Sequence, residues 1–146
     1  MRENQGLWWA GPMSPFDSHI IRLFLHVLAA TIWVGGQFTL AALVPTARAL
    51  GDDAPKKVAR AFNKMAWPAF GVLVITGVWN LLEVDVADRP TRYHVLLGVK
   101  LLAVAASGIG AGIHIVGRSK AALAIGGSFA GLGAAVALFC GVWLGN

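Results

Sequence analysis

Four long apolar runs, separated by short polar segments, dominate the pattern of this chain. They cover about residues 20–44, 65–82, 93–116 and 121–144, and each is nearly free of charge. Because an α-helix rises 1.5 Å per residue, about 20 apolar residues cross a hydrocarbon core about 30 Å thick. The pattern predicts an all-α membrane protein, a bundle of four transmembrane helices that forms one domain over residues 1–146.

Composition supports a membrane protein over a soluble one. Hydrophobic residues make up 57% of the chain and charged residues only 13%, which leaves too little charge to cover a soluble surface. The net charge is +5, but Lys and Arg lie mainly at the ends of the apolar runs, where they match anionic lipid headgroups. We therefore expect the lipid bilayer as partner and no nucleic acid. The single cysteine, Cys140, excludes an intramolecular disulfide.

The distribution of Lys and Arg predicts the orientation of the helices. Loops rich in these residues stay in the cytoplasm. The segments that join the first two spans and the last two spans hold Arg48, Lys56, Lys57, Arg60, Lys64, Arg118 and Lys120. We expect these two segments inside, and the N-terminus, the 83–92 segment and Asn146 outside.

Two tripeptides recur in the same order along the chain. His26-Val27-Leu28 in the first span matches His94-Val95-Leu96 in the third, and Gly77-Val78-Trp79 in the second matches Gly141-Val142-Trp143 in the fourth. The recurrence predicts a duplicated helical hairpin, with parallel repeats related by a pseudo-two-fold axis along the membrane normal. This symmetry would place His26 and His94 at similar depth on facing helices.

Ionisable side chains inside the spans are the candidates for function, because their burial in lipid is costly. They are His19, Arg22, His26, His94, Lys100 and His114. A haem b held between the imidazoles of His26 and His94 is the functional interpretation. Arg22 and Arg92, near the outer surface, are expected to pair with its propionates.

Each of these residues also has a structural interpretation. His19 and His114 lie near the membrane surfaces, where a hydrogen bond to a backbone carbonyl or water explains them; they are the alternate ligands. Lys100 either extends to the outer surface or faces an anionic cofactor group, a substrate or a proton path. The spacings Gly108-x-x-x-Gly112 and Gly127-x-x-x-Gly131 predict close packing of the third and fourth helices, with a homo-oligomer or a larger complex as the alternative.

Copper is the competing ligand. Met13, His19, His26, His94 and Cys140 all lie toward the outer half, and sulfur with imidazole suits copper. No Met-x-x-Met or His-rich tract accompanies them, however. A cofactor-free subunit of a larger membrane complex is the third interpretation.

Three stretches resemble the CopD-like superfamily of small bacterial membrane proteins: HVLAATIWVGG from His26, ITGVWNLL in the second span and YHVLLGVKLL in the third. That superfamily includes the membrane domain of copper-resistance proteins and the haem-associated HemJ-type protoporphyrinogen oxidases. The resemblance implies a bacterial cytoplasmic membrane and functional roles for His26 and Lys100. This chain lacks the additional helices of the copper-resistance proteins. Its residues around His26 differ from the HemJ-type pattern, so protoporphyrinogen oxidation is not carried over.

Overall fold

The computed structural model describes residues 18–145, and Met13 therefore lies outside the described part. Within that part the chain is helical and contains no strand, which confirms the predicted all-α fold. Four helical spans are long and apolar enough to cross a membrane. They are Ser18–Ala49, which comprises α1 (Ser18–Ala30), the π-helix η1 (Thr31–Gly35) and α2 (Gly36–Ala49); α3 (Ala54–Leu82); α4 (Thr91–Val116); and α5 (Lys120–Leu144).

Two helices extend beyond the spans that hydropathy predicts. The first was predicted to end at about residue 44 but continues through Pro45 to Ala49. Proline has no backbone N–H, so the Ala41 carbonyl loses its hydrogen bond there, but the helix continues past it. The helix α3 begins at Ala54, because its polar first turns stay helical outside the apolar run, with Pro55 accommodated in the first turn.

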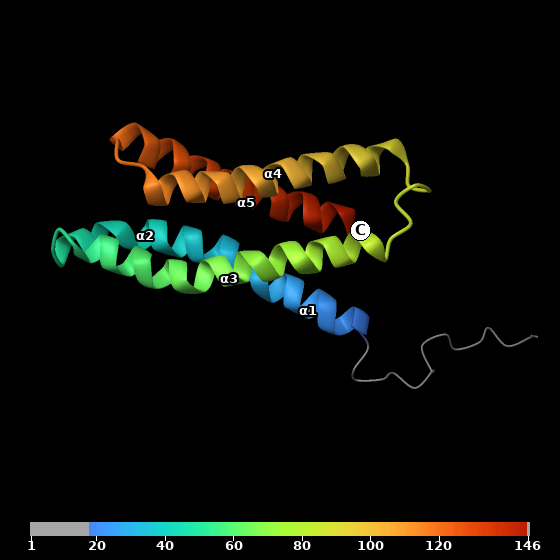
Figure 1. The fold of residues 1–146 in the computed structure, drawn as a ribbon, viewed down its shortest axis with the longest axis horizontal. Helices are drawn as coiled ribbons and strands as arrows, with labels where there is room; N and C mark the ends of the chain where they lie inside the picture. The colour runs from blue at the N-terminus through green and yellow to red at the C-terminus, as the bar shows by residue number, and fades with distance from the viewer. Residues whose placement is uncertain (1–17, 146) are drawn as a thin grey trace, which may run out of the picture.

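The four spans form two antiparallel hairpins (Figure 1). The first span pairs with α3, and α4 pairs with α5. The α2–α3 and α4–α5 connections lie at one end of the bundle, whereas the α3–α4 connection, the start of α1 and the end of α5 lie at the other. This is the arrangement that the predicted duplication requires, with both hairpins running in the same direction.

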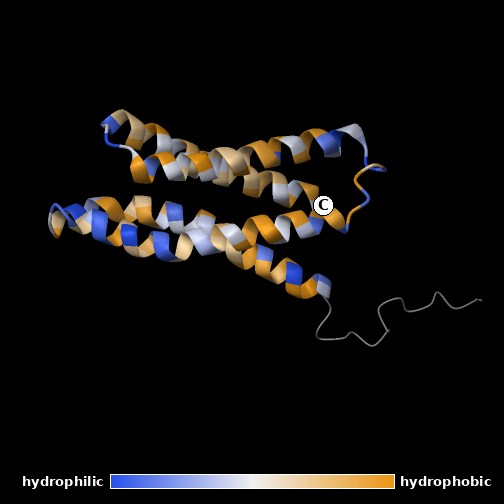
Figure 2. Ribbon diagram, viewed as in Figure 1, coloured by the Kyte–Doolittle hydropathy of each residue, from blue (hydrophilic) through white to orange (hydrophobic). Residues whose placement is uncertain are grey.

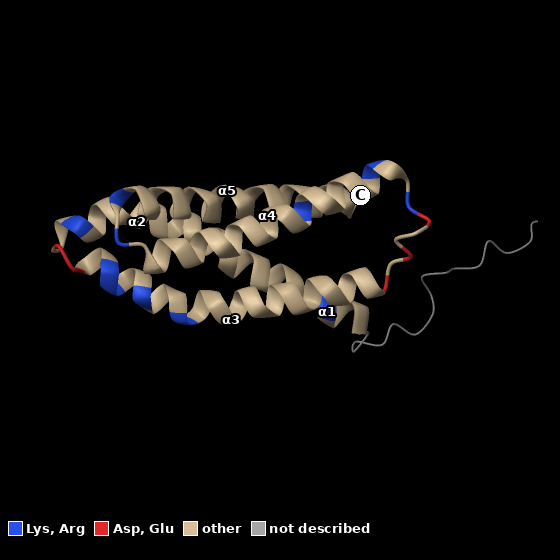
Figure 3. Cartoon of the chain, turned by 45° about the horizontal axis from the view of Figure 1, so that its top comes forward, with Lys and Arg blue, Asp and Glu red and all other residues tan. Residues whose placement is uncertain are grey.

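The faces that point away from the bundle are apolar, which suits contact with lipid. Phe24, Ile75, Leu102 and Leu132 are each more than 60% exposed, and hydrophilic residues gather mainly toward the two ends of the helices (Figure 2). Lys and Arg are concentrated at the end that holds the α2–α3 and α4–α5 connections, while the α3–α4 connection carries both signs of charge (Figure 3). The lipid bilayer is thus the environment that this fold requires.

Glycines bring the backbones of α4 and α5 into direct contact, but they are not the glycines that the sequence spacing indicated. A Cβ on Gly126 would lie 2.6 Å from the backbone nitrogen of His114, and one on Gly110 would lie 2.6 Å from that of Ala130. Gly133 approaches the Ala103 carbonyl oxygen in the same way, at 2.7 Å. Small residues commonly allow such packing between membrane helices.

Of the four glycines in the predicted spacings, only Gly127 lies between the two helices, against the ring of His114 on α4. Gly112 and Gly131 face open space, and Gly108 contacts the ring of Phe70 on α3. The expectation that these glycines pack the third and fourth helices together is therefore confirmed for Gly127 and wrong for Gly108, Gly112 and Gly131. Each helix carries glycines on several faces, and sequence spacing alone does not select the face that is buried.

Candidate functional site

The two hairpins present matching polar units in the halves that lie toward the α3–α4 connection. In the first hairpin, a Cβ on Gly77 would lie 3.4 Å from the His26 ring carbon Cε1. In the second, a Cβ on Gly141 would lie 3.4 Å from the Lys100 Nζ. Since Gly77 and Gly141 hold the same place in the repeated Gly-Val-Trp tripeptide, the contacts make Lys100 the counterpart of His26.

Burial repeats in the same register. His26 and Lys100 are separated by the same 74 residues as Trp33 and Ser107, which lie two turns further along their helices. Four pairs of buried residues then correspond between the hairpins. Ala29 matches Ala103 and Trp33 matches Ser107 at this interval. Ala66 matches Ala130 and Thr76 matches Cys140 at the interval that separates Gly77 from Gly141. The duplication is therefore visible in packing, even though only two of these four pairs are identical residues.

This register corrects the expected equivalence of His26 and His94. His94 lies nearer the N-terminal end of α4 than Lys100, its side chain is exposed, and its ring neighbours that of Tyr93 at 6.3 Å between centroids. The recurring Gly-Val-Trp tripeptide marks equivalent positions because each glycine makes room for a polar side chain. The recurring His-Val-Leu tripeptide does not mark equivalent positions. Ligation of one centre by both histidines stays a prediction.

A hydrogen bond orients the His26 ring. Its Nδ1 lies 2.9 Å from the Thr76 Oγ1, which is itself 2.7 Å from the Val72 carbonyl oxygen. The threonine hydroxyl has one proton and donates it to that carbonyl, so its oxygen accepts from the imidazole. We therefore assign the proton to Nδ1. The other ring nitrogen, Nε2, keeps a free lone pair, as in histidines that ligate metals.

Lys100 carries a charge inside the third span and has no acidic partner. Among residues 18–145 it makes neither an ion pair nor a hydrogen bond. Its ammonium lies against Gly141, and the free thiol of the preceding residue, Cys140, is buried. An unpaired cation in a medium of low dielectric constant is costly, which makes this position suited to an anionic group.

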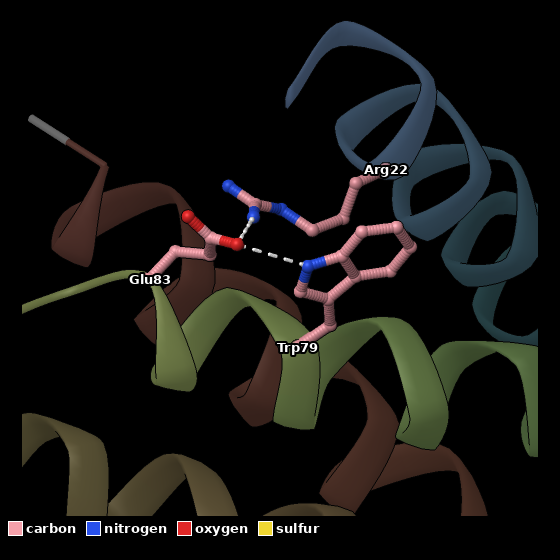
Figure 4. Close-up of polar contacts among 3 residues, drawn as sticks. All are labelled: Arg22, Trp79 and Glu83. Carbon is pink, nitrogen blue, oxygen red and sulfur yellow. Dashed lines mark hydrogen bonds and ion pairs between the residues drawn. The ribbon is translucent and has the colours of Figure 1, made fainter. Parts of the chain in front are cut away.

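Arg22 has a partner within the protein, and its expected role toward haem propionates stays a prediction. Its guanidinium lies 3.3 Å from the Glu83 Oε1, the oxygen that also accepts a 3.1 Å hydrogen bond from the Trp79 indole (Figure 4). The guanidinium also lies over the Trp79 ring, 5.7 Å from its centroid. The Arg22 side chain is only 6% exposed, and Glu83 neutralises its charge from the more exposed end of α3.

The remaining candidates lie apart from this site. The His114 Nδ1 lies 2.6 Å from the Leu123 carbonyl oxygen beside the α4–α5 turn, the backbone contact that the structural interpretation expected. His19 and Arg92 are exposed at the N-terminal ends of α1 and α4. In the described residues, no three His, Cys, Asp or Glu side chains lie close enough together to hold an ion.

Sequence reasoning missed several residues that complete the site. Thr76, Ser107 and Glu83 were not candidates, and Trp33 was not assigned a partner. The first two carry hydroxyls that sit within apolar runs and are 3% and 1% exposed. The signal that could have identified them is the duplication itself, once it is read in the register of Gly77 and Gly141.

Comparisons with protein-family models, with curated proteins and with solved structures gave no match to this chain.

Proposed function

We propose that this chain is a b-type haem protein of the membrane that acts in electron transfer or haem-linked redox chemistry, with His26 as an axial ligand. The observation that carries the proposal is the hydrogen bond between His26 and Thr76. It leaves the Nε2 lone pair of a partly buried imidazole free in the outer half of the bundle. Bound haem would supply one-electron oxidation and reduction.

Lys100 supports this proposal through its charge. Haem b carries two propionates, and an ammonium without an acidic partner is suited to pair with one of them. Arg22 is already paired with Glu83, so Lys100 replaces it as the proposed propionate partner from within the spans. The resemblance to the CopD-like superfamily, in which a first-helix histidine and a third-helix lysine are functional, agrees with this choice.

Haem is a better match than copper for chemical reasons. The porphyrin supplies four of the iron's ligands, so one or two imidazoles complete the coordination. A protein copper site needs several protein ligands close together, and the described residues contain no group of three His, Cys, Asp or Glu side chains that could hold an ion. His26 and Cys140 remain the residues on which the copper alternative would rest. A cofactor-free subunit is the third alternative.

An absorption spectrum of the purified protein tests the function. We expect a Soret band whose position shifts on reduction with dithionite, at about one haem per chain. A colourless protein that carries stoichiometric copper would replace haem with the copper alternative. Absence of both haem and copper would leave the chain as a cofactor-free subunit.

We also propose the bacterial cytoplasmic membrane as location, with both termini outside. The support is the cluster of Lys and Arg at the end that holds the α2–α3 and α4–α5 connections. A periplasm-active reporter such as alkaline phosphatase should be active when fused after Asn146 and inactive when inserted within residues 52–57. A reporter active only in the cytoplasm gives the opposite pattern, and its activity at the C-terminus would reverse the orientation.

A further inference from the structure

The indole of Trp33 lies where all four spans meet. Trp33 is 3% exposed, and its ring packs against Phe70 and Trp67 of α3, at 4.4 and 5.7 Å between centroids. Its Nε1 donates a 3.0 Å hydrogen bond to the Ser107 Oγ of α4, which in turn donates a 2.8 Å hydrogen bond to the Ala130 carbonyl oxygen of α5. One side chain thus links the first span to the other three.

The backbone at Trp33 is also unusual. Trp33 is the middle residue of the π-helix η1, and π-helical turns are rare and frequently occur at functional sites. The first span crosses α3 here, so that α1 and α2 lie on opposite sides of it (Figure 1). The extra residue of a π-turn changes the direction in which α1 and α2 present their side chains. The π-turn at Trp33 therefore determines the direction in which α1 presents His26.

The hydrogen bond joins equivalent positions of the two repeats, since Trp33 and Ser107 share the register of His26 and Lys100. Two helical turns separate each bonded residue from the polar residue on the same helix, a distance of about 10 Å. Among the described residues, the hairpins also meet where α5 contacts η1 and α2, and where Gly108, next to Ser107, lies against the Phe70 ring of α3. The distance between the halves that hold His26 and Lys100 thus depends largely on the contact between Trp33 and Ser107.

We propose that Trp33 and Ser107 are positioning residues whose hydrogen bond fixes the spacing between His26 and Lys100. The bond lies in a buried site, where an unpartnered indole N–H or hydroxyl would be costly, and this favours a single arrangement of the hairpins. For the haem chemistry proposed above, a fixed spacing keeps the axial ligand and the cationic partner in constant geometry. That part of the inference rests on the proposed function, but the spacing itself does not.

A distance measurement tests the spacing without haem. Spin labels are placed on cysteines at Val27 and Val95, which are 56% and 59% exposed, in full-length protein that also carries Cys140→Ala. Trp33→Phe removes the N–H and keeps an aromatic ring, while Ser107→Ala removes the acceptor. We expect either substitution to broaden and lengthen the distance distribution between the labels, and the double variant to do so no more than the larger single effect.

Trp67→Phe is the matched control, since it makes the same change in the same aromatic cluster at a residue outside the hydrogen bond. Unchanged distances in Trp33→Phe and Ser107→Ala would overturn the inference, as would equal changes in all three variants. In protein that binds haem, Trp33→Phe and Ser107→Ala should also shift the reduction potential, and Trp67→Phe should not. A haem potential unchanged in both would refute positioning of the site. Absence of haem in the wild type would instead refute the proposed function, and the label distances would still decide the spacing.

Discussion

Gly126→Ala is expected to destabilise the α4–α5 hairpin by about 1–3 kcal/mol, the usual cost of an extra methyl group in a tightly packed interior. The added Cβ would lie 2.6 Å from the His114 nitrogen and 2.8 Å from the Gly110 carbonyl oxygen. Both atoms belong to the backbone, so no side chain can rotate to make room and the two helices must separate. Loss of helicity in detergent, titrated with dodecyl sulfate and followed by circular dichroism, measures the change.

Gly131→Ala on the same helix is the control for this prediction. A Cβ there meets nothing within 4 Å, so the substitution adds a methyl group without a collision. Its midpoint should equal that of the wild type or rise slightly, because alanine is the better helix former. Equal destabilisation by both substitutions would mean that glycine flexibility, and not the close approach of the backbones, stabilises the hairpin.

The number and pairing of the spans could be predicted from sequence, because the bilayer imposes a strong constraint. A segment either supplies about 20 apolar residues or does not cross, and short connections force neighbours to pair. The ends of the helices could not be predicted as well. Polar residues from Ala54 onward continue the α3 helix outside the apolar run, and no hydropathy signal records this. The π-turn at Trp33 likewise leaves no mark in the pattern of apolar residues.

His26 and Lys100 could be singled out from sequence because a charge or imidazole inside a span is costly. The residues that contact them could not be predicted. His94 and Lys100 are six residues apart and lie about 120° from each other around the helix. A tripeptide match contains no information on which of the two faces Gly141. Buried hydroxyls such as Thr76 and Ser107 are equally inconspicuous, since serine and threonine in membrane helices often bond only to their own backbone.

His26→Ala is expected to have the largest effect on the proposed function. If the imidazole is an axial ligand, its removal eliminates the bond between the protein and the iron, and haem should fall to background in the purified variant. Thr76→Val tests the same site more gently, because it keeps the shape of the side chain and removes the acceptor of the His26 hydrogen bond. Loss of such a supporting group typically weakens binding about 10- to 100-fold.

His94→Ala decides whether a second histidine takes part. With an exposed side chain and Lys100 in the position that matches His26, we expect this variant to retain haem and its spectrum. Loss of haem in His94→Ala together with His26→Ala would restore the paired-ligand hypothesis and require the outer end of α4 to turn inward on binding. Retention of haem in His26→Ala would show that His26 is not an iron ligand. Because Lys100→Met removes a charge and not a ligand, it should weaken haem retention while leaving the spin state as it is in the wild type.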